Sequence, residues 1–287
     1  MILNADSLIR NRHKDKFFGI DYYANICFGS NPMLKYLSTP LDFFPLSNEK
    51  PPMVAKQREE ALFKRMEQFD EQKIIGLYDN PDVYQCHESI ANIIEKASEC
   101  HHGLFIITSS LNLLHDIEQL RAFNQHQPLL IALPIGGMKD LKISALCDYH
   151  RYKQIETLSK ALLKHHISFG YIIKPVIPYV NDDVDQFKTF LARLISHQPS
   201  FIYPTFSITF DSKKLNHFYE LIDHELPELK SRYFDEYGYK KSWMSPNASQ
   251  LKRTFIFEIK KTKIAYSMKQ IIDLYKTSSN LKQMALF

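Results

Sequence analysis

Carboxylates that could do chemistry follow directly after an apolar run of the sequence. The run is Lys73–Tyr78, and Asp79, Asp82 and Glu88 come soon after it. Carboxylate oxygens bind Mg²⁺ and also serve as general acids and bases. Asp82 and Glu88 are therefore the candidate catalytic residues, while a simple helix cap is the alternative for Asp82.

Cysteine and histidine occur together at two places, which at first suggests a metal site. The two groups are Cys86-His87 and Cys100-His101-His102. They bracket one predicted helix, so Cys86 and Cys100 would lie roughly 20 Å apart. No single metal ion spans that distance. We therefore predict no metal site here and expect these residues to be core or surface side chains.

An alternation of strands and helices positions these residues. Short, mostly continuous apolar runs are typical of strands buried on both faces. They predict strands at Gly19–Phe28, Lys73–Tyr78, Leu104–Thr108, Leu129–Pro134, Ser168–Pro175 and Phe201–Thr209. Apolar residues at helical spacing predict intervening helices at Val54–Phe69, Glu88–Cys100, Asn112–His126, Tyr152–His166 and Asp183–His197. We expect Asn181 and Asp182 to provide the N-cap of the last of these helices.

Six strand–helix units predict an α/β fold with a parallel sheet. Such units can curl into a partial (β/α)6 barrel with the helices outside, and a doubly wound open sheet is the alternative. The chain after Thr209 reads as helical at Lys213–His224, Glu228–Tyr237 and Asn247–Lys260, and a capping box at Ser267–Gln270 opens a last helix. The predicted organisation is a barrel over residues 1–210, a helical extension packed on it over 211–276, and a flexible tail over 277–287.

The composition bounds the class of protein. Of the 287 residues, 45% are hydrophobic and 24% are charged, as in soluble globular proteins. No apolar run approaches the ~20 residues that span a bilayer, and the N-terminus lacks a secretory signal pattern. Four scattered cysteines favour a reducing compartment, so we expect a cytoplasmic protein without a membrane partner.

Residues at the expected strand ends resemble a known family. Short segments in a characteristic order carry the resemblance: Gly19–Tyr22, Asn25, Gly29, Lys174–Pro178 with Asn181-Asp182, Phe201–Pro204, Ser245–Asn247 and the Gln283–Phe287 end. Together they resemble the spore photoproduct lyase-like radical SAM proteins, which include the DNA repair photolyase type, from about Gly19 to Phe287. The resemblance implies a radical-SAM-type barrel with its chemistry at the carboxyl ends of the strands.

Three residues of this chain depart from the family at its iron–sulfur cluster. Family members hold a [4Fe–4S] cluster through three cysteines after the first strand. In register with Asn25 and Gly29, those positions are Ser30, Leu34 and Leu37 here. Leucine offers iron no lone pair, and a neutral serine hydroxyl is a poor substitute for a thiolate. We therefore expect the cluster to be absent and predict no bound cofactor.

Three further positions keep open the binding of S-adenosylmethionine. Arg151 matches a family arginine that would pair with the carboxylate of S-adenosylmethionine. Thr108 ends the third strand, where the family has Thr-Lys-Ser, and Asn181 follows the fifth. A surface arginine at a helix start is the alternative for Arg151.

Two segments could still contact partners. The terminal Gln283-Met284-Ala285-Leu286-Phe287 resembles the pentapeptide by which bacterial polymerases and repair proteins dock on the DNA sliding clamp. In that reading Leu286 and Phe287 fill an apolar pocket while the Gln283 amide fixes the register. A tail packed on its own domain is the alternative.

Lysines and arginines recur from Lys252 to Lys263, where phosphate contacts and weak DNA binding compete with a solvated helix face. The sequence thus favours a radical SAM-like protein without a cluster, a pseudoenzyme that acts by binding or regulation. The alternative is an active lyase or S-adenosylmethionine-binding enzyme with non-standard ligands or another chemistry at the barrel mouth.

Overall fold

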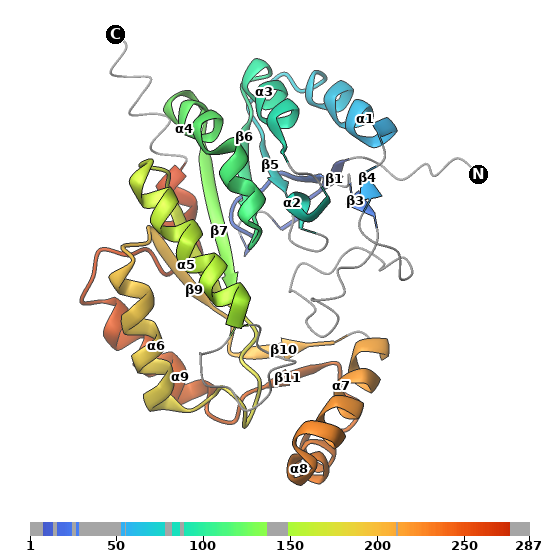
Figure 1. Cartoon of the computed structure of the whole chain (residues 1–287), viewed down its shortest axis with the longest axis vertical. Coiled ribbons are helices and arrows are strands. Elements are labelled where there is room, and N and C mark those ends of the chain that lie inside the picture. Colours follow the sequence, from blue (N-terminus) through green and yellow to red (C-terminus); the bar gives the residue numbers. More distant parts are fainter. Residues whose placement is uncertain are drawn as a thin grey trace.

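A computed structural model gives the fold, and Figure 1 shows the arrangement of its elements. The structure describes residues 8–13, 16–24, 27–28, 53–54, 56–77, 82–86, 89–136, 149–210 and 212–275.

A seven-stranded sheet forms the centre of the molecule, in the order β1-β2-β5-β6-β7-β8-β9. Its strands are β1 (Leu8–Arg10), β2 (Tyr22–Ala24), β5 (Ile74–Leu77), β6 (Gly103–Ile107), β7 (Leu129–Ile135), β8 (Phe169–Ile173) and β9 (Phe201–Pro204). From β2 to β9 every neighbouring pair is parallel, whereas β1 pairs antiparallel with β2. The α/β class and the parallel sheet expected from the sequence are thereby confirmed.

The strands of the main sheet are adjacent in the same order in which they follow one another along the chain. Right-handed crossovers between adjacent parallel strands put all the connecting helices on the same face. The helices are α1 (Lys56–Met66), α2 (Val83–Cys86), α3 (Ala91–Glu99), α4 (Ile117–His126), α5 (Tyr149–Lys164) and α6 (Val184–Ser196). The terminal strands β1 and β9 are not paired with each other in the part of the chain that the structure describes. Closure into a partial barrel stays a prediction.

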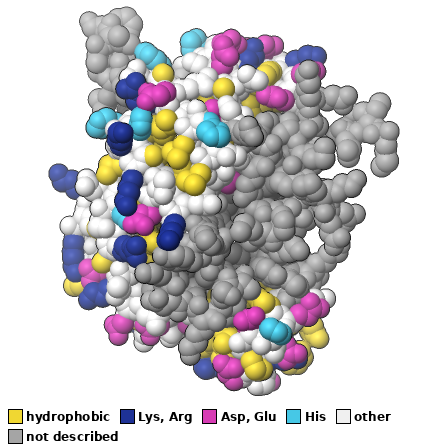
Figure 2. Space-filling model, viewed as in Figure 1, with side chains coloured by type: hydrophobic (Ala, Val, Ile, Leu, Met, Phe, Trp, Pro, Cys, Tyr) yellow, Lys and Arg dark blue, Asp and Glu magenta, His cyan; other side chains and the backbone are white. Residues whose placement is uncertain are grey.

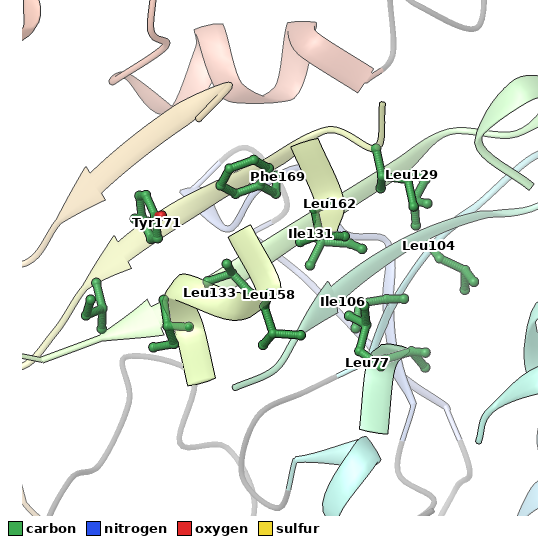
Figure 3. Close-up of a cluster of buried hydrophobic side chains, with 14 of the residues drawn as sticks. Leu77, Leu104, Ile106, Leu129, Ile131, Leu133, Leu158, Leu162, Phe169 and Tyr171 are labelled. Atoms are coloured by element: carbon green, nitrogen blue, oxygen red, sulfur yellow. The ribbon is translucent and has the colours of Figure 1, made fainter. Parts of the chain in front are cut away.

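The main hydrophobic core lies between this sheet and its helices. Strand residues that face the helices, such as Leu104, Ile131 and Phe169, belong to one hydrophobic cluster with Leu158 and Leu162 of α5, part of which Figure 3 shows. All of these side chains are at most 2% exposed. Strands buried on both faces need continuous apolar runs, which is why the sequence revealed them.

The opposite face of the sheet is covered by segments from both ends of the chain. Phe18 and Ile20, before β2, pack with Phe105 of β6, and the helical residues 268–275 bring Ile271 and Tyr275 to the same cluster. The rings of Phe18 and Phe105 stack with centroids 4.9 Å apart, and the Tyr275 hydroxyl donates to the carbonyl oxygen of Phe18. These contacts fill the face that would line a barrel interior.

A lobe with its own core follows β9. It consists of β10 (Ser207–Thr209), β11 (Ser242–Met244), α7 (Ser212–Glu225) and α8 (Pro227–Tyr237), built around the buried Trp243. In Figure 1 it lies at the end of the molecule toward which β7 points. The following helix α9 (Ala248–Ile259) instead returns to the main core, where it packs beside α6.

Four element predictions need correction. The expected strand Phe201–Thr209 is two strands in different sheets, because the chain leaves the main sheet after Pro204. The expected helix Asn112–His126 begins with a 3-10 turn over Leu111–Asp116. The N-cap of α6 is Asp183, whose side chain accepts from the Gln186 amide, and not Asn181 or Asp182. The expected strand Gly19–Phe28 is also two strands, because only β2 lies in the main sheet and β3 (Cys27–Phe28) pairs with β4 (Met53–Val54) in a separate one.

Candidate functional site

Asp82, in the loop after β5, and Thr108, directly after β6, are bonded to each other, a contact that the sequence did not predict. Asp82 is only 1% exposed. One carboxylate oxygen accepts a hydrogen bond from the Tyr84 amide at 3.0 Å, and the other accepts from the Thr108 hydroxyl at 2.8 Å and the Ser109 amide at 3.0 Å. The carboxylate therefore ties the loop after β5 to the end of β6.

A second buried carboxylate lies close by and was not predicted from the sequence. Asp116 is 3% exposed, and it accepts from the Ser89 hydroxyl at 2.5 Å and from the Ile90 amide at 2.7 Å. It falls inside the segment read as one continuous helix, where an aspartate looks like a solvent-facing residue. The 3-10 turn that turns it inward has no clear signal in the sequence.

Tyr84 lies near both carboxylates. Its side chain is fully buried and its hydroxyl has no hydrogen-bond partner. Burial raises the pKa of the Tyr84 phenol, and the negative charges of Asp116 and Asp82 raise it further. The phenol is therefore held neutral beside the two carboxylates.

Asn181 serves the loop after β8 rather than a ligand. It is 5% exposed, its amide oxygen accepts from the Ile177 amide at 2.5 Å, and its amide nitrogen donates to the Pro175 carbonyl at 3.0 Å. Both functional atoms of the side chain are thus bonded within residues 175–181. This loop includes a cis peptide bond between Lys174 and Pro175.

Asp182 connects this loop to the beginning of α9. Its carboxylate accepts from the Tyr179 amide at 2.9 Å and the Ser245 hydroxyl at 2.6 Å, and its carbonyl oxygen accepts from the Asn247 side chain at 3.1 Å. Burial raises the pKa of the Asp182 carboxyl, against the opposing effect of the Ser245 hydrogen bond. The Ser245-Pro246-Asn247 segment therefore closes the lobe onto the loop after β8.

Histidine 102 has a structural role. It is fully buried, with one ring nitrogen 3.0 Å from the Met66 carbonyl and the other 3.2 Å from the Lys73 amide that donates to it. These partners require a neutral ring that donates through Nε2, and burial lowers the pKa of His102. Among the described residues, no group of three or more His, Cys, Asp and Glu could hold a metal ion.

The remaining predicted site residues are not placed by the structure. Arg151 lies in the first turn of α5, but its side chain is outside the described set. Also outside the described residues are Glu88, the three cluster positions Ser30, Leu34 and Leu37, and the tail residues Gln283, Met284, Leu286 and Phe287.

The fold and these contacts define an α/β protein with a largely parallel sheet, whose described strand ends are joined by buried polar side chains. No protein-family model, curated protein or solved structure matches the chain. None of the described helices is both long enough and apolar enough to cross a membrane.

Proposed function

We propose that the chain is a radical SAM-like protein of the spore photoproduct lyase type that works without an iron–sulfur cluster. In this proposal it acts by binding or regulation in DNA repair and reaches the sliding clamp through its tail. The proposal includes a partial (β/α)6 barrel as the specific fold. The sequential parallel order of the strands from β2 to β9 is compatible with such a barrel.

The donor atoms at the cluster positions carry the proposal. A [4Fe–4S] cluster needs thiolates, and Ser30, Leu34 and Leu37 present one neutral hydroxyl and two hydrocarbon chains. These side chains do not fit the cluster, so the proposed function does not involve radical chemistry at these positions.

The internal bonding of the predicted site residues supports a binding role over catalysis. Asp82 and Thr108 bond each other at 2.8 Å, and Asn181 bonds two backbone groups of its own loop. A general base must be able to reach a substrate proton at hydrogen-bond distance. A carboxylate 1% exposed and bonded to three donors of its own chain is poorly suited to that task.

Anaerobic reconstitution with iron and sulfide tests the missing cluster. We expect the native chain to remain colourless and to retain no stoichiometric iron. The variant Ser30→Cys/Leu34→Cys/Leu37→Cys is the matched control, because it supplies the three thiolates without changing the rest of the chain. A brown native protein with an iron–sulfur absorption band would overturn the proposal.

The tail is tested separately by binding to a purified bacterial sliding clamp. Leu286→Ala/Phe287→Ala should abolish binding, because these two side chains are the apolar anchors of the proposed contact. Ser278→Ala/Ser279→Ala lies in the same tail and should leave binding unchanged. Equal binding by both variants, or none by the native chain, would refute the clamp contact.

The alternative function is an enzyme that kept the fold and uses Asp82, Glu88 and Arg151 for another chemistry, with S-adenosylmethionine or Mg²⁺ as a ligand. The two buried carboxylates of Asp82 and Asp116, both near the buried Tyr84 phenol, are the observation that favours it. Calorimetry with S-adenosylmethionine and with Mg²⁺ separates the two functions. Saturable binding that Arg151→Ala or Asp82→Asn removes would support the enzyme.

A further inference from the structure

Positive charge is concentrated on three helical segments. Residues 149–164, 184–196 and 248–263 contain eleven Lys and Arg but only three Asp and Glu, which is a net charge of +8. The whole chain has a net charge of +4, so the rest of the molecule is net negative. The net charge of the whole chain therefore does not reveal that these three segments are strongly basic.

The fold brings these segments side by side, with α6 in the middle. Arg193 of α6 lies 3.7 Å from the Glu156 carboxylate of α5, and Lys188 of α6 lies 3.7 Å from the Glu258 carboxylate of α9. We call the outward faces of these three helices the basic surface. Figure 2 shows Lys and Arg side chains gathered on the flank that α5 and α6 occupy in Figure 1.

The two carboxylates on these contacts are recessed beneath the cations. The side chains of Glu156 and Glu258 are 27% and 18% exposed, whereas those of Lys160 and Lys188 are 73% and 59% exposed. Each carboxylate is shared by more than one cation: Glu156 by Lys160 and Arg193, and Glu258 by Lys188 and Lys261. Exposed ion pairs of this kind are worth about 0–1 kcal/mol, so the cations can turn toward another anion.

The surface is suited to phosphates rather than to stacked bases. Phe257 is the large exposed aromatic side chain among the described residues of these helices, and the Lys261 ammonium lies over its ring at 4.0 Å. Proteins that hold single strands stack bases on several open aromatic rings. Proteins that hold a duplex without reading sequence place Lys and Arg against its phosphates.

We propose that the basic surface of α5, α6 and α9 binds the phosphate backbone of double-stranded nucleic acid without reading its sequence. The contact uses Lys160 and Lys164 from α5, Lys188 and Arg193 from α6, Lys252 from α9 and Lys260 at the C-terminal cap of α9. It lies on the helical side of the sheet, away from the strand ends, and it does not depend on the tail or on the iron–sulfur question.

Fluorescence anisotropy with labelled 20-base-pair duplexes tests the proposal on the full chain, between about 50 and 200 mM KCl. Lys160→Gln/Lys260→Gln should weaken binding about tenfold and reduce the slope of log affinity against log salt by about 2, as expected for the loss of two phosphate contacts. The matched control is Lys240→Gln/Lys241→Gln, which removes two exposed lysines from the lobe. DNA and RNA duplexes should behave alike if the backbone is the ligand.

The proposal is overturned if the native chain does not bind either duplex, or if both variants weaken binding equally. Tighter binding to a single strand, to an acidic peptide or to anionic vesicles than to a duplex would overturn it as well. Each of these outcomes leaves the reconstitution and clamp experiments unaffected, so failure here is distinguishable from failure of the proposed function.

Discussion

Polar side chains buried at the strand ends stabilise this fold through bonds to their own chain. Asp82 shows the pattern, with three donors from two different segments within 3.0 Å of its carboxylate. Hydrogen bonds to a buried charged group contribute about 1.5–3 kcal/mol.

Replacing Asp82 with asparagine should therefore lower stability. The amide group of Asp82→Asn would place a donor either against the Tyr84 amide or against both the Thr108 hydroxyl and the Ser109 amide. We expect the free energy of unfolding to fall by about 2 kcal/mol, measured by urea denaturation followed by circular dichroism. Asp70→Asn, at an exposed position, is the control. An unchanged stability would revive Asp82 as a residue kept for chemistry.

The buried His102 and the partly buried His197 make the stability of the protein depend on pH. Burial lowers the pKa of both His102 and His197, and His197 also bonds the Tyr171 hydroxyl at 2.7 Å. Because the folded pKa is below the unfolded value of about 6.5, the unfolded chain binds more protons in acid. Their contribution to stability is present above that value and is lost as the pH falls below it.

His102→Gln should flatten this dependence, because glutamine can reproduce both hydrogen bonds without titrating. We expect the loss of unfolding free energy between pH 7.5 and pH 5 to be smaller in the variant, by up to about 1.4 kcal/mol per pH unit. The exposed His126→Gln should retain the native dependence. Identical profiles for all three proteins would contradict the assignment of a neutral His102.

At the level of elements, the last described helix seals the second face of the sheet. Its capping box is reciprocal. The Ser267 Oγ accepts from the backbone N–H of Gln270 at 3.3 Å, and the Gln270 side-chain Oε1 accepts from the backbone N–H of Ser267 at 3.1 Å. The capping box predicted from the sequence is confirmed.

Ser267→Ala should cost about 1 kcal/mol of unfolding free energy, since a lost N-cap leaves helix amides without partners. Hydrogen exchange should show faster exchange in residues 268–275 and in their partner Phe18. Ser196→Ala, an exposed hydroxyl at the end of α6, should have little effect on either measurement. No change in exchange at residues 268–275 would contradict a sealing role for this helix.

Strands and most helices could be predicted from the sequence, because their patterns are local. The runs that predicted β5, β6 and β7 are continuous and apolar since both faces of these strands are buried. Covering of the second face by Phe18 and Tyr275 could not be predicted, because it joins residues 257 positions apart. Asp116 was missed for the same reason, since its bonds to Ser89 and Ile90 cross from one segment to another.

On the scale of the whole molecule, the hydrophobic clusters are spread over the sheet and the lobe, whereas the net positive charge is concentrated in three helical segments. Three hydrophobic clusters exist among the described residues: one on each face of the sheet and one in the lobe. The three segments with a net charge of +8 contribute their helices to the first cluster. A protein that is only mildly basic overall can in this way direct one flank toward a polyanion.

The aromatic lobe gives the molecule a built-in optical reporter. Trp243 is the chain's single tryptophan, and the ring of Tyr237 stacks on it with centroids 4.8 Å apart. Its emission therefore follows the lobe, while circular dichroism mainly follows the sheet and its helices. Ser245→Ala removes a donor from Asp182, where the lobe joins the loop after β8. The emission midpoint in urea should then shift further than the dichroism midpoint, and equal shifts would mean that lobe and sheet melt as one unit.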